Sequence, residues 1–306
     1  MIIKMHEEEV RKNSLRAWML AARPKTLAGA AVPVLIGAAL AVNDSAWSPQ
    51  WMPMMLCFLF AFIMQIDANF VNDYFDFVRG NDDETRLGPK RACAEGWISP
   101  RAMRYALVVT TVLGCFVGLP LVFYGGWTMV AVGALCVVFC FLYTTYLSYK
   151  GLGDLLVLVF FGLVPVCLTY YLSLPAGHQT VTLEALLASV ACGLVIDLLL
   201  TINNYRDIDN DRNAGKITVA VRLGASRTRR LYYYLGFTAC IIDCVFCFYG
   251  HDLAFFLTGI FLWLHVNTYQ EMMRINKGRG LNKVLGLTAR NMFVYGLCVA
   301  VGVLLS

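Results

Sequence analysis

Long apolar runs alternate with shorter polar stretches along the whole chain. Nine runs approach the length of about 20 residues that a membrane-spanning helix needs. They cover residues 27–42, 53–72, 103–123, 127–147, 152–174, 183–203, 229–249, 252–272 and 284–305. The first run is short, and we expect its helix to begin in the polar segment that precedes it. The pattern predicts an all-α integral membrane protein with nine transmembrane helices.

The basic residues mark one side of these predicted helices. Lys and Arg gather before the first run and around the connections after the second, fourth, sixth and eighth, whereas the other connections contain none. Arg290, inside the ninth run, is the exception, and it would either reach the interface or face a polar cavity. Since cytoplasmic loops carry the excess of Lys and Arg, we expect a cytoplasmic N-terminus, an external C-terminus and a place in the cell (inner) membrane.

The composition agrees with a chain that contacts the lipid bilayer. Hydrophobic residues make up 59% of it and charged residues only 15%, against about 25% charged residues in soluble domains. The net charge of +5 therefore belongs to one membrane face, and no nucleic-acid-binding motif is present. The eleven cysteines are scattered singly, which favours small packing residues over a thiolate metal site.

Two stretches at the cytoplasmic ends of predicted helices concentrate amides and carboxylates. The first acidic segment is NFVNDYFDFVRGNDDETR (69–86), and the second is TINNYRDIDNDRNAGK (201–216). At a helical period of about 100° per residue, one face of the first helix carries Gln65, Asn69, Asn72, Asp73 and Asp76. One face of the second carries Asn203, Asn204, Asp207, Asn210 and Asp211. Asp67 and Asp209 fall on the opposite faces.

Carboxylate and amide oxygens on two such helices suit a hard divalent cation. Mg²⁺ takes oxygen ligands, keeps several waters and commonly completes its shell from a substrate phosphate. The alternative is that these residues only cap helix ends and line solvated loops, where Asn and Asp are common. The equivalent positions of the two segments favour the metal site. The four histidines show no spacing typical of zinc ligands.

Cations follow each acidic segment closely in the sequence. Lys90 and Arg91 come soon after the first, and Lys216 and Arg222 end or follow the second. The positive-inside rule alone would explain basic residues on this face. Their position nevertheless suits a diphosphate that is bridged by metal and held by Lys and Arg. Because the helices behind are apolar, the diphosphate would carry a lipid tail, as a polyprenyl diphosphate does.

The two acidic segments resemble the paired aspartate-rich motifs of the UbiA superfamily of membrane-embedded aromatic prenyltransferases. NDYFD and RDIDND carry the likeness, and longer matching stretches extend it over residues 22–41, 65–89, 151–154, 160–162 and 203–224. The family implies nine helices around a central cavity and Mg²⁺-dependent ionisation of an allylic diphosphate. The likeness is greatest to the branch that transfers a polyprenyl group to 1,4-dihydroxy-2-naphthoate in menaquinone biosynthesis, with loss of CO₂ and pyrophosphate.

The resemblance also implies roles for individual residues. The expected ligands of one Mg²⁺ are Asn72, Asp73, Asp76 and Asp82, and those of a second are Asn203, Asp207 and Asp211. Of these, the expected catalytic aspartates are Asp73, Asp76, Asp207 and Asp211. Residues expected to bind or orient the substrates are Gln65, Asn69, Arg91, Lys216, Arg222, Tyr143, Lys150 and Arg23. For Tyr143 and Arg23, a plain interface role is the alternative.

Two acidic residues have two interpretations each. Asp197 lies deeper in the sixth run, where it would either face the cavity and touch the aromatic acceptor or be a buried structural acid. Asp154, at the inner end of the fifth run, would bind a head group or merely cap its helix.

The whole chain, 1–306, is expected to form one domain. Spans two and six run in the same direction and precede the two long loops. This suggests a parallel pseudo-repeat of residues 14–147 and 152–272, followed by a final helix at 284–305. Competing interpretations are a related prenyltransferase acting on 4-hydroxybenzoate or homogentisate, and a transporter of cations or phosphate esters. Transport sites usually lie near the bilayer midplane, whereas both acidic segments lie at helix ends.

Overall fold

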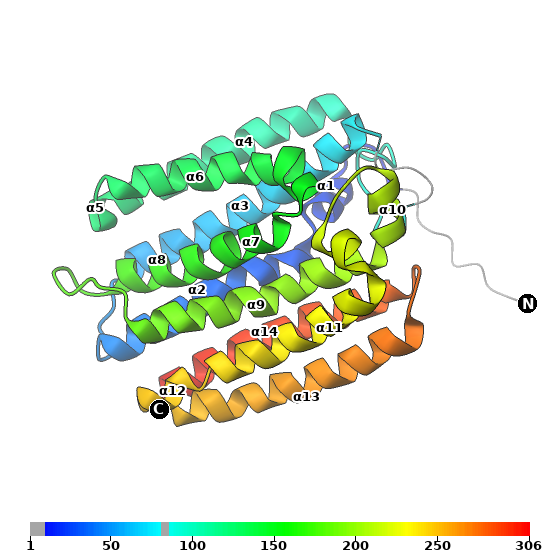
Figure 1. Ribbon diagram of the computed structural model, residues 1–306. Helices are drawn as coiled ribbons and strands as arrows, with labels where there is room; N and C mark the ends of the chain where they lie inside the picture. Colours follow the sequence, from blue (N-terminus) through cyan, green and yellow to red (C-terminus); the bar gives the residue numbers. More distant parts are fainter. Residues whose placement is uncertain (1–9, 81–85) are drawn as a thin grey trace, which may run out of the picture.

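A bundle of long, roughly parallel and antiparallel helices makes up the computed structural model, which describes residues 10–80 and 86–306 (Figure 1). Its first half contains α1 (Leu15–Ala22), α2 (Pro24–Asp44), α3 (Trp51–Val78), α4 (Pro100–Gly118), η1 (Leu119–Leu121), α5 (Val122–Gly125), α6 (Thr128–Leu142), η2 (Tyr143–Leu147) and η3 (Ser148–Lys150). The second half contains α7 (Gly153–Val157), η4 (Leu158–Leu163), α8 (Val164–Ser173), α9 (Leu183–Arg206), α10 (Ile208–Asn213), α11 (Val219–Ile242), α12 (Val245–Phe248), α13 (Asp252–Ile275) and α14 (Leu281–Leu305).

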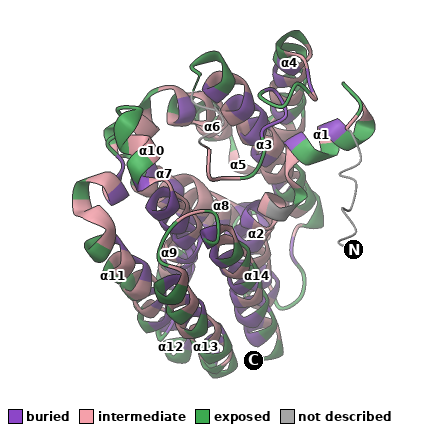
Figure 2. Cartoon of the chain, turned by 90° about the vertical axis from the view of Figure 1, so that its right-hand side faces the viewer, coloured by how far each residue is buried: buried purple, intermediate pink, exposed green. Residues whose placement is uncertain are grey.

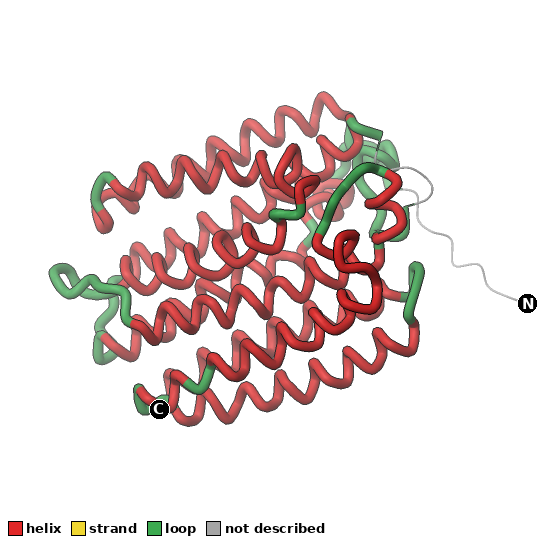
Figure 3. Tube along the Cα trace, in the orientation of Figure 1, coloured by secondary structure: helices red, strands yellow, loops and turns green. Residues whose placement is uncertain are grey.

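The described chain contains helices and loops but no strand (Figure 3). Each of the nine predicted spans falls on one of the long helices or on a nearly continuous helical stretch. Within residues 10–80 and 86–306, eight helical stretches are long and apolar enough to cross a membrane. The predicted span 252–272 forms α13 but is not among these eight, because its second half carries several polar residues, including His265, Asn267 and Glu271. The helix of the first predicted span, α2, begins at Pro24, within the polar segment, as expected.

Side chains at the helix starts explain where several helices begin. Ser99 accepts a hydrogen bond from the backbone amide of Ala102, and Pro100 occupies the first helical position. Thr182 and Thr218 cap α9 and α11 in the same manner. A capping oxygen satisfies one of the amide groups that a helix leaves unpaired at its start.

The helices differ in how much of their surface other helices cover. In the most apolar part of each helix, 67% of the residues of α9 and 61% of those of α2 are buried, against 6% for the stretch Thr128–Lys150. Helix α2 packs against α14, α8 and α3, while α9 packs against α11 and η4. Figure 2 shows this as buried residues concentrated on the central helices and exposed residues on the outer ones.

Close approach of α2 and α8 depends on Gly37. A Cβ atom at this position would lie 2.4 Å from the carbonyl oxygen of Val166 and 3.1 Å from Cβ of Thr169. Any larger residue would therefore push the two helices apart.

Both acidic segments lie at the same end of the bundle. In Figure 1, α1, α10 and the last turns of α3 and α9 gather at one end, while the C-terminus lies at the other. Two stretches of π-helix interrupt the helices: Tyr143–Leu147 beside this end, and Leu158–Leu163 deeper in the bundle, against the Ser189–Gly193 part of α9. Such interruptions are frequent at functional sites.

Candidate active site

A cavity of about 1360 Å³ runs between the helices from the end that carries the acidic segments. Around its mouth lie asparagine, aspartate, lysine and arginine residues from α3, α9, α10 and the loops beside them. Farther in, the wall is formed mainly by apolar side chains, among them Phe60, Phe139, Phe160, Leu168 and Leu172. The cavity can therefore accept a molecule with a polar head and a long apolar tail.

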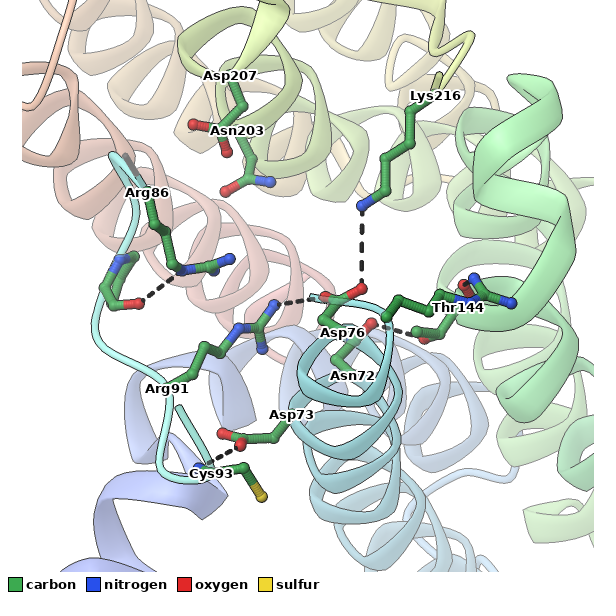
Figure 4. A network of polar contacts seen from close by, with 12 residues as sticks. Asn72, Asp73, Asp76, Arg86, Arg91, Cys93, Thr144, Asn203, Asp207 and Lys216 are labelled. Atoms are coloured by element: carbon green, nitrogen blue, oxygen red, sulfur yellow. Dashed lines mark hydrogen bonds and ion pairs between the residues drawn. The ribbon is translucent and has the colours of Figure 1, made fainter. Parts of the chain in front are cut away.

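The first acidic segment brings two of its polar residues to this mouth. Asn72 and Asp76 lie on the last two turns of α3 and line the cavity. The Thr144 hydroxyl donates to Oδ1 of Asn72 at 2.6 Å. Asp76 accepts from Nη2 of Arg91 at 3.2 Å, and Lys216 Nζ lies 4.0 Å from its other oxygen (Figure 4). Asp76 is thus held between cations from two separate loops.

The second acidic segment reaches the same cavity. Helix α9 ends at Arg206, Asp207 lies at the break, and α10 follows. The cavity-lining residues of this segment are Asn203, Asn204, Asp207, Asn210, Asp211, Ala214 and Lys216. The sequence prediction that Asp209 points elsewhere agrees with its position, since Asp209 is exposed and lies 3.7 Å from Arg212.

Arg206 organises the break between α9 and α10. Its buried guanidinium donates to both carboxylate oxygens of Asp207 at 2.8 and 2.5 Å. It also donates to Oδ1 of Asn203 at 2.8 Å and to Oδ1 of Asn282 at 2.8 Å. The charge of Asp207 is therefore balanced by a planar, bidentate partner.

The carboxyl group of Asp211, on the short helix α10, has a raised pKa. Burial raises the pKa of its carboxyl to about 6, and Lys216 opposes this rise. The nearby carboxylates of Asp207 and Asp76 raise the pKa further. The electrostatic interaction between Asp211 and Asp76 shows that the two acidic segments act on one another across the mouth.

The carboxylate of Asp73 binds backbone amides instead of facing the cavity, where a metal ligand is expected. Its carboxylate is 1% exposed and accepts hydrogen bonds from the backbone amides of Ala92 at 2.9 Å and Cys93 at 2.8 Å. Arg23 lies 3.7 Å from the same carboxylate. Asp73 is absent from the cavity wall, because these contacts turn it toward the loop that carries Arg91 (Figure 4). In this arrangement it fixes the loop.

Three expected substrate-binding residues also lie away from the cavity wall. The side-chain amide of Asn69 donates to the Ala22 carbonyl and the Thr26 hydroxyl, both at 2.9 Å, and so ties α3 to the start of α2. Arg222 donates to the Lys150 carbonyl at 2.7 Å. The Lys150 ammonium lies over the Tyr146 ring at 4.2 Å. These contacts join neighbouring elements rather than face a ligand.

The other expected residues do line the cavity. They are Gln65, Arg91, Lys216, Tyr143 and Arg23. Asp82 lies outside the described residues. Asp67, which the sequence places on the other face of α3, accepts hydrogen bonds from Thr110 and Thr111 of α4, the second at 3.0 Å.

The cavity lining therefore contains the oxygen ligands that Mg²⁺ prefers. Asn72, Asp76, Asn203, Asp207 and Asp211 all line one cavity, and carboxylate and amide oxygens favour a hard cation. Among residues 10–80 and 86–306, no three His, Cys, Asp or Glu side chains already form a metal-sized cluster. The reason is visible at Asp76 and Asp207, whose carboxylates are neutralised by Arg91, Lys216 and Arg206.

Some residues of the site give no clear signal in the sequence. Thr144 reaches Asn72 from a π-helical turn, and the backbone amides of Ala92 and Cys93 bind Asp73. Arg206 is the exception, since its place between Asn203 and Asp207 in the motif could have suggested a structural cation.

The chain is similar to known proteins over nearly its whole length. The sequence pattern of the UbiA prenyltransferase family matches residues 30–302. The 1,4-dihydroxy-2-naphthoate octaprenyltransferase of Escherichia coli (strain K12) is 33% identical over 312 residues, covering 99% of each chain.

Two solved structures have a similar fold. The apo structure of a UbiA homologue from Aeropyrum pernix K1 matches with a TM-score of 0.70 and 16% identity, covering 91% of this chain and 98% of that one. A UbiA homologue from Archaeoglobus fulgidus bound to DMAPP and Mg²⁺ matches with a TM-score of 0.61 and 14% identity, covering 93% and 99%. At these identities, the likeness concerns the fold.

Proposed function

Because the chain belongs to the UbiA prenyltransferase family, we propose that it transfers a polyprenyl group from polyprenyl diphosphate to 1,4-dihydroxy-2-naphthoate. The products are demethylmenaquinol, CO₂ and pyrophosphate, which makes the reaction a step of menaquinone biosynthesis. Support comes from the E. coli relative, which is named for this naphthoate and matches the chain from end to end.

One observation carries the proposal. Both acidic segments and their basic neighbours line the mouth of a single cavity whose deeper wall is apolar. A diphosphate head bound at the mouth would place its prenyl tail along the apolar wall. A water-soluble metabolite would leave this wall without a partner.

The proposed Mg²⁺ ligands are Asn72 and Asp76 for one ion, and Asn203, Asp207 and Asp211 for the other. Asp82 remains a further candidate beside the first set. When bound, Mg²⁺ stabilises the negative charge that develops on the departing diphosphate. The similar fold bound to DMAPP and Mg²⁺ supports a metal-dependent prenyl transfer.

The basic residues hold the diphosphate in this proposal. Arg91 and Lys216 now contact Asp76, and each would exchange this contact for a phosphate oxygen when the substrate enters. Arg206 keeps its bidentate contact with Asp207 and thereby fixes that carboxylate. Asp73 acts indirectly, because it holds the backbone beside Arg91.

The remaining wall protects the reacting carbon. As the allylic C–O bond breaks, the pyrophosphate leaves with the electron pair, and the naphthoate ring forms the new C–C bond. The bond between the ring and the carboxylate then breaks, CO₂ is released, and the electron pair of that bond returns to the ring. Tyr143 lines the cavity near the mouth and can present an electron-rich ring to the developing cation. Apolar neighbours such as Phe139 and Phe160 exclude water.

The proposal includes an orientation in the membrane, which the distribution of basic residues supports. Nine helices, with α13 included, would span the inner membrane as one domain built from the two pseudo-repeats and the final helix. The N-terminus and the cavity mouth would face the cytoplasm, where the basic loops lie, and the C-terminus would lie outside.

Purified protein in lipid tests the function directly. We expect prenylated naphthoquinol and pyrophosphate in equal amounts from dihydroxynaphthoate and a polyprenyl diphosphate, with no turnover after chelation and recovery with Mg²⁺. Parallel reactions with 4-hydroxybenzoate and homogentisate identify the acceptor. Turnover with either of these but not with the naphthoate would replace the acceptor assignment. Full activity without divalent metal, or no pyrophosphate release from any acceptor, would overturn the enzyme assignment.

A further inference from the structure

Two acidic residues outside the proposed metal site lie beside each other in the membrane-embedded part of the bundle, one in the wall of the cavity and one outside its lining. Asp154, at the start of α7, lines the cavity. Asp197 lies on the neighbouring helix α9 and is only 6% exposed. Its Oδ1 atom is buried and has no hydrogen-bond partner within the described part of the chain. The mechanism above uses neither residue.

The packing of α9 against the α7–η4 stretch sets the two carboxyl groups opposite each other. A Cβ at Gly162 would lie 2.6 Å from the Ser189 carbonyl, and a Cβ at Gly193 would lie 3.2 Å from Cα of Leu158. The two antiparallel backbones therefore touch at these glycines. Asp197 follows Gly193 by four residues, and Asp154 precedes Leu158 by four. Because the two helices are antiparallel, this register places Asp197 opposite Asp154, one helical turn closer to the mouth.

Contacts on either side of the pair support this register. A Cβ at Gly153 would lie 3.2 Å from Cδ2 of Leu200 and 3.8 Å from the Tyr143 hydroxyl. Asp197 interacts electrostatically with Asp154, and Tyr143 interacts with both carboxyl groups. Asp154, Asp197 and Tyr143 thus form one polar cluster in an otherwise apolar region.

A purely structural role does not explain this cluster. Elsewhere in the same membrane-embedded bundle, the buried Asp67 satisfies both carboxylate oxygens with Thr110 and Thr111. Asp197 has no such hydroxyl donor on Oδ1, and an unsatisfied buried polar atom is costly. Two adjacent carboxyl groups in apolar surroundings cannot both be ionised, so at least one of them carries a proton. Such a pair can both donate and accept a hydrogen bond.

We propose that Asp154, with Asp197 beside it, binds the 4-hydroxyl group of the aromatic acceptor, an inference that rests on the proposed function. A hydroxyl group matches the pair because it also donates and accepts. The 1-hydroxyl of the naphthoate is adjacent to the carboxylate and bonds to it internally, which leaves the 4-hydroxyl available. Asp197 precedes Asn203 by six residues on α9, or ~9 Å along the helix axis, which leaves room for the aromatic ring between the diphosphate and the pair.

The experiment compares two ligands on three proteins. Binding of 1,4-dihydroxy-2-naphthoate and of 1-hydroxy-2-naphthoate, which lacks the 4-hydroxyl, is measured on wild type, Asp197→Asn and Asp154→Asn. We expect wild type to prefer the dihydroxy compound about tenfold, the equivalent of one hydrogen bond. Both variants should lose most of this preference and raise KM for the acceptor, while KM for polyprenyl diphosphate stays within about twofold of wild type. Asp154→Asn alone carries the test if Asp197→Asn does not accumulate.

Asp67→Asn is the matched control. It also replaces a buried carboxyl group in a membrane helix, but Asp67 faces α4 and accepts hydrogen bonds from Thr110 and Thr111 there, so its ligand preference should equal that of wild type. If wild type turns over the naphthoate and the Asp154 and Asp197 variants keep the wild-type preference, the hydroxyl assignment is wrong and the proposed function stands. If wild type makes no product from the naphthoate, the proposed function fails first.

Discussion

Lys216 Nζ lies 4.0 Å from a carboxylate oxygen of Asp76, so the basic residue that ends the second acidic segment reaches the first across the mouth of the cavity. Some 140 residues of sequence separate the two. Arg91 contacts the other oxygen of Asp76 from a third direction. Cations from two other parts of the chain therefore converge on one carboxylate, and this convergence motivates the predictions that follow.

Replacing the proposed metal ligands should remove turnover without unfolding the protein. Asp76→Asn and Asp207→Asn each remove one charged oxygen from the cavity mouth, and we expect kcat to fall ~100-fold or more, as for other groups that stabilise a developing charge. Steady-state rates at several Mg²⁺ concentrations measure the effect. Asp209→Asn is the control, because Asp209 belongs to the same segment but is exposed and lies outside the cavity wall.

Asp73→Asn should behave differently from Asp76→Asn. An asparagine can accept only one of the two backbone amide bonds that Asp73 now accepts, so we expect a loss of about 1–3 kcal/mol in the free energy of unfolding. KM for polyprenyl diphosphate should rise, since the loop beside Arg91 loosens, while the Mg²⁺ requirement should stay the same. Thermal unfolding and initial rates check both effects. A loss of kcat equal to that of Asp76→Asn with full stability would instead make Asp73 a direct ligand.

The open space beside Gly133 offers a test of where the prenyl tail lies. Gly133 lines the cavity, and a Cβ there would meet no atom within 4 Å. Gly133→Leu should therefore narrow the apolar part of the cavity and favour shorter polyprenyl diphosphates, with short-chain turnover retained. Competition between diphosphates of different length gives the preference. Gly259→Leu is the control, because Gly259 also has open space around it but does not line the cavity.

A histidine at the opposite end of the bundle should make stability depend on pH. His251 is 5% exposed, and its Nδ1 lies 2.6 Å from Oε1 of Glu184. This hydrogen bond raises the pKa of His251, and burial opposes the rise. Because the folded pKa lies above the unfolded value of about 6.5, the contribution is complete below that pH and disappears as pH rises through the folded pKa.

Melting temperatures measured from pH 6 to 9 provide the test of that contribution. We expect wild type to lose about 1–2 kcal/mol across this range from the one contact. Glu184→Gln should flatten the dependence, since it removes the partner charge. His178→Gln should not, because His178 lies exposed in a loop. The prediction fails if Glu184→Gln and wild type show the same slope.

The sequence by itself determined the helices and the chemistry available to them. A chain segment in lipid must satisfy the hydrogen bonds of its own backbone, and a helix does so. Each long apolar run could therefore be identified as a helix from the sequence. Asn72, Asp76, Asp207 and Asp211 could be assigned to helix ends because they lie where the apolar runs end. The helical period then shows which of these residues share a face. The same period places Asp67 and Asp209 on the faces turned away from these residues.

Only the tertiary structure decided which of these side chains meet. Asp73 has the same helical face and residue type as Asp76, yet its carboxylate binds the amides of Ala92 and Cys93. Asp197 faces Asp154 because glycines allow two backbones to touch one turn away. Such choices depend on how separate helices and loops pack, and a local periodicity carries no information on contacts between residues far apart in the chain.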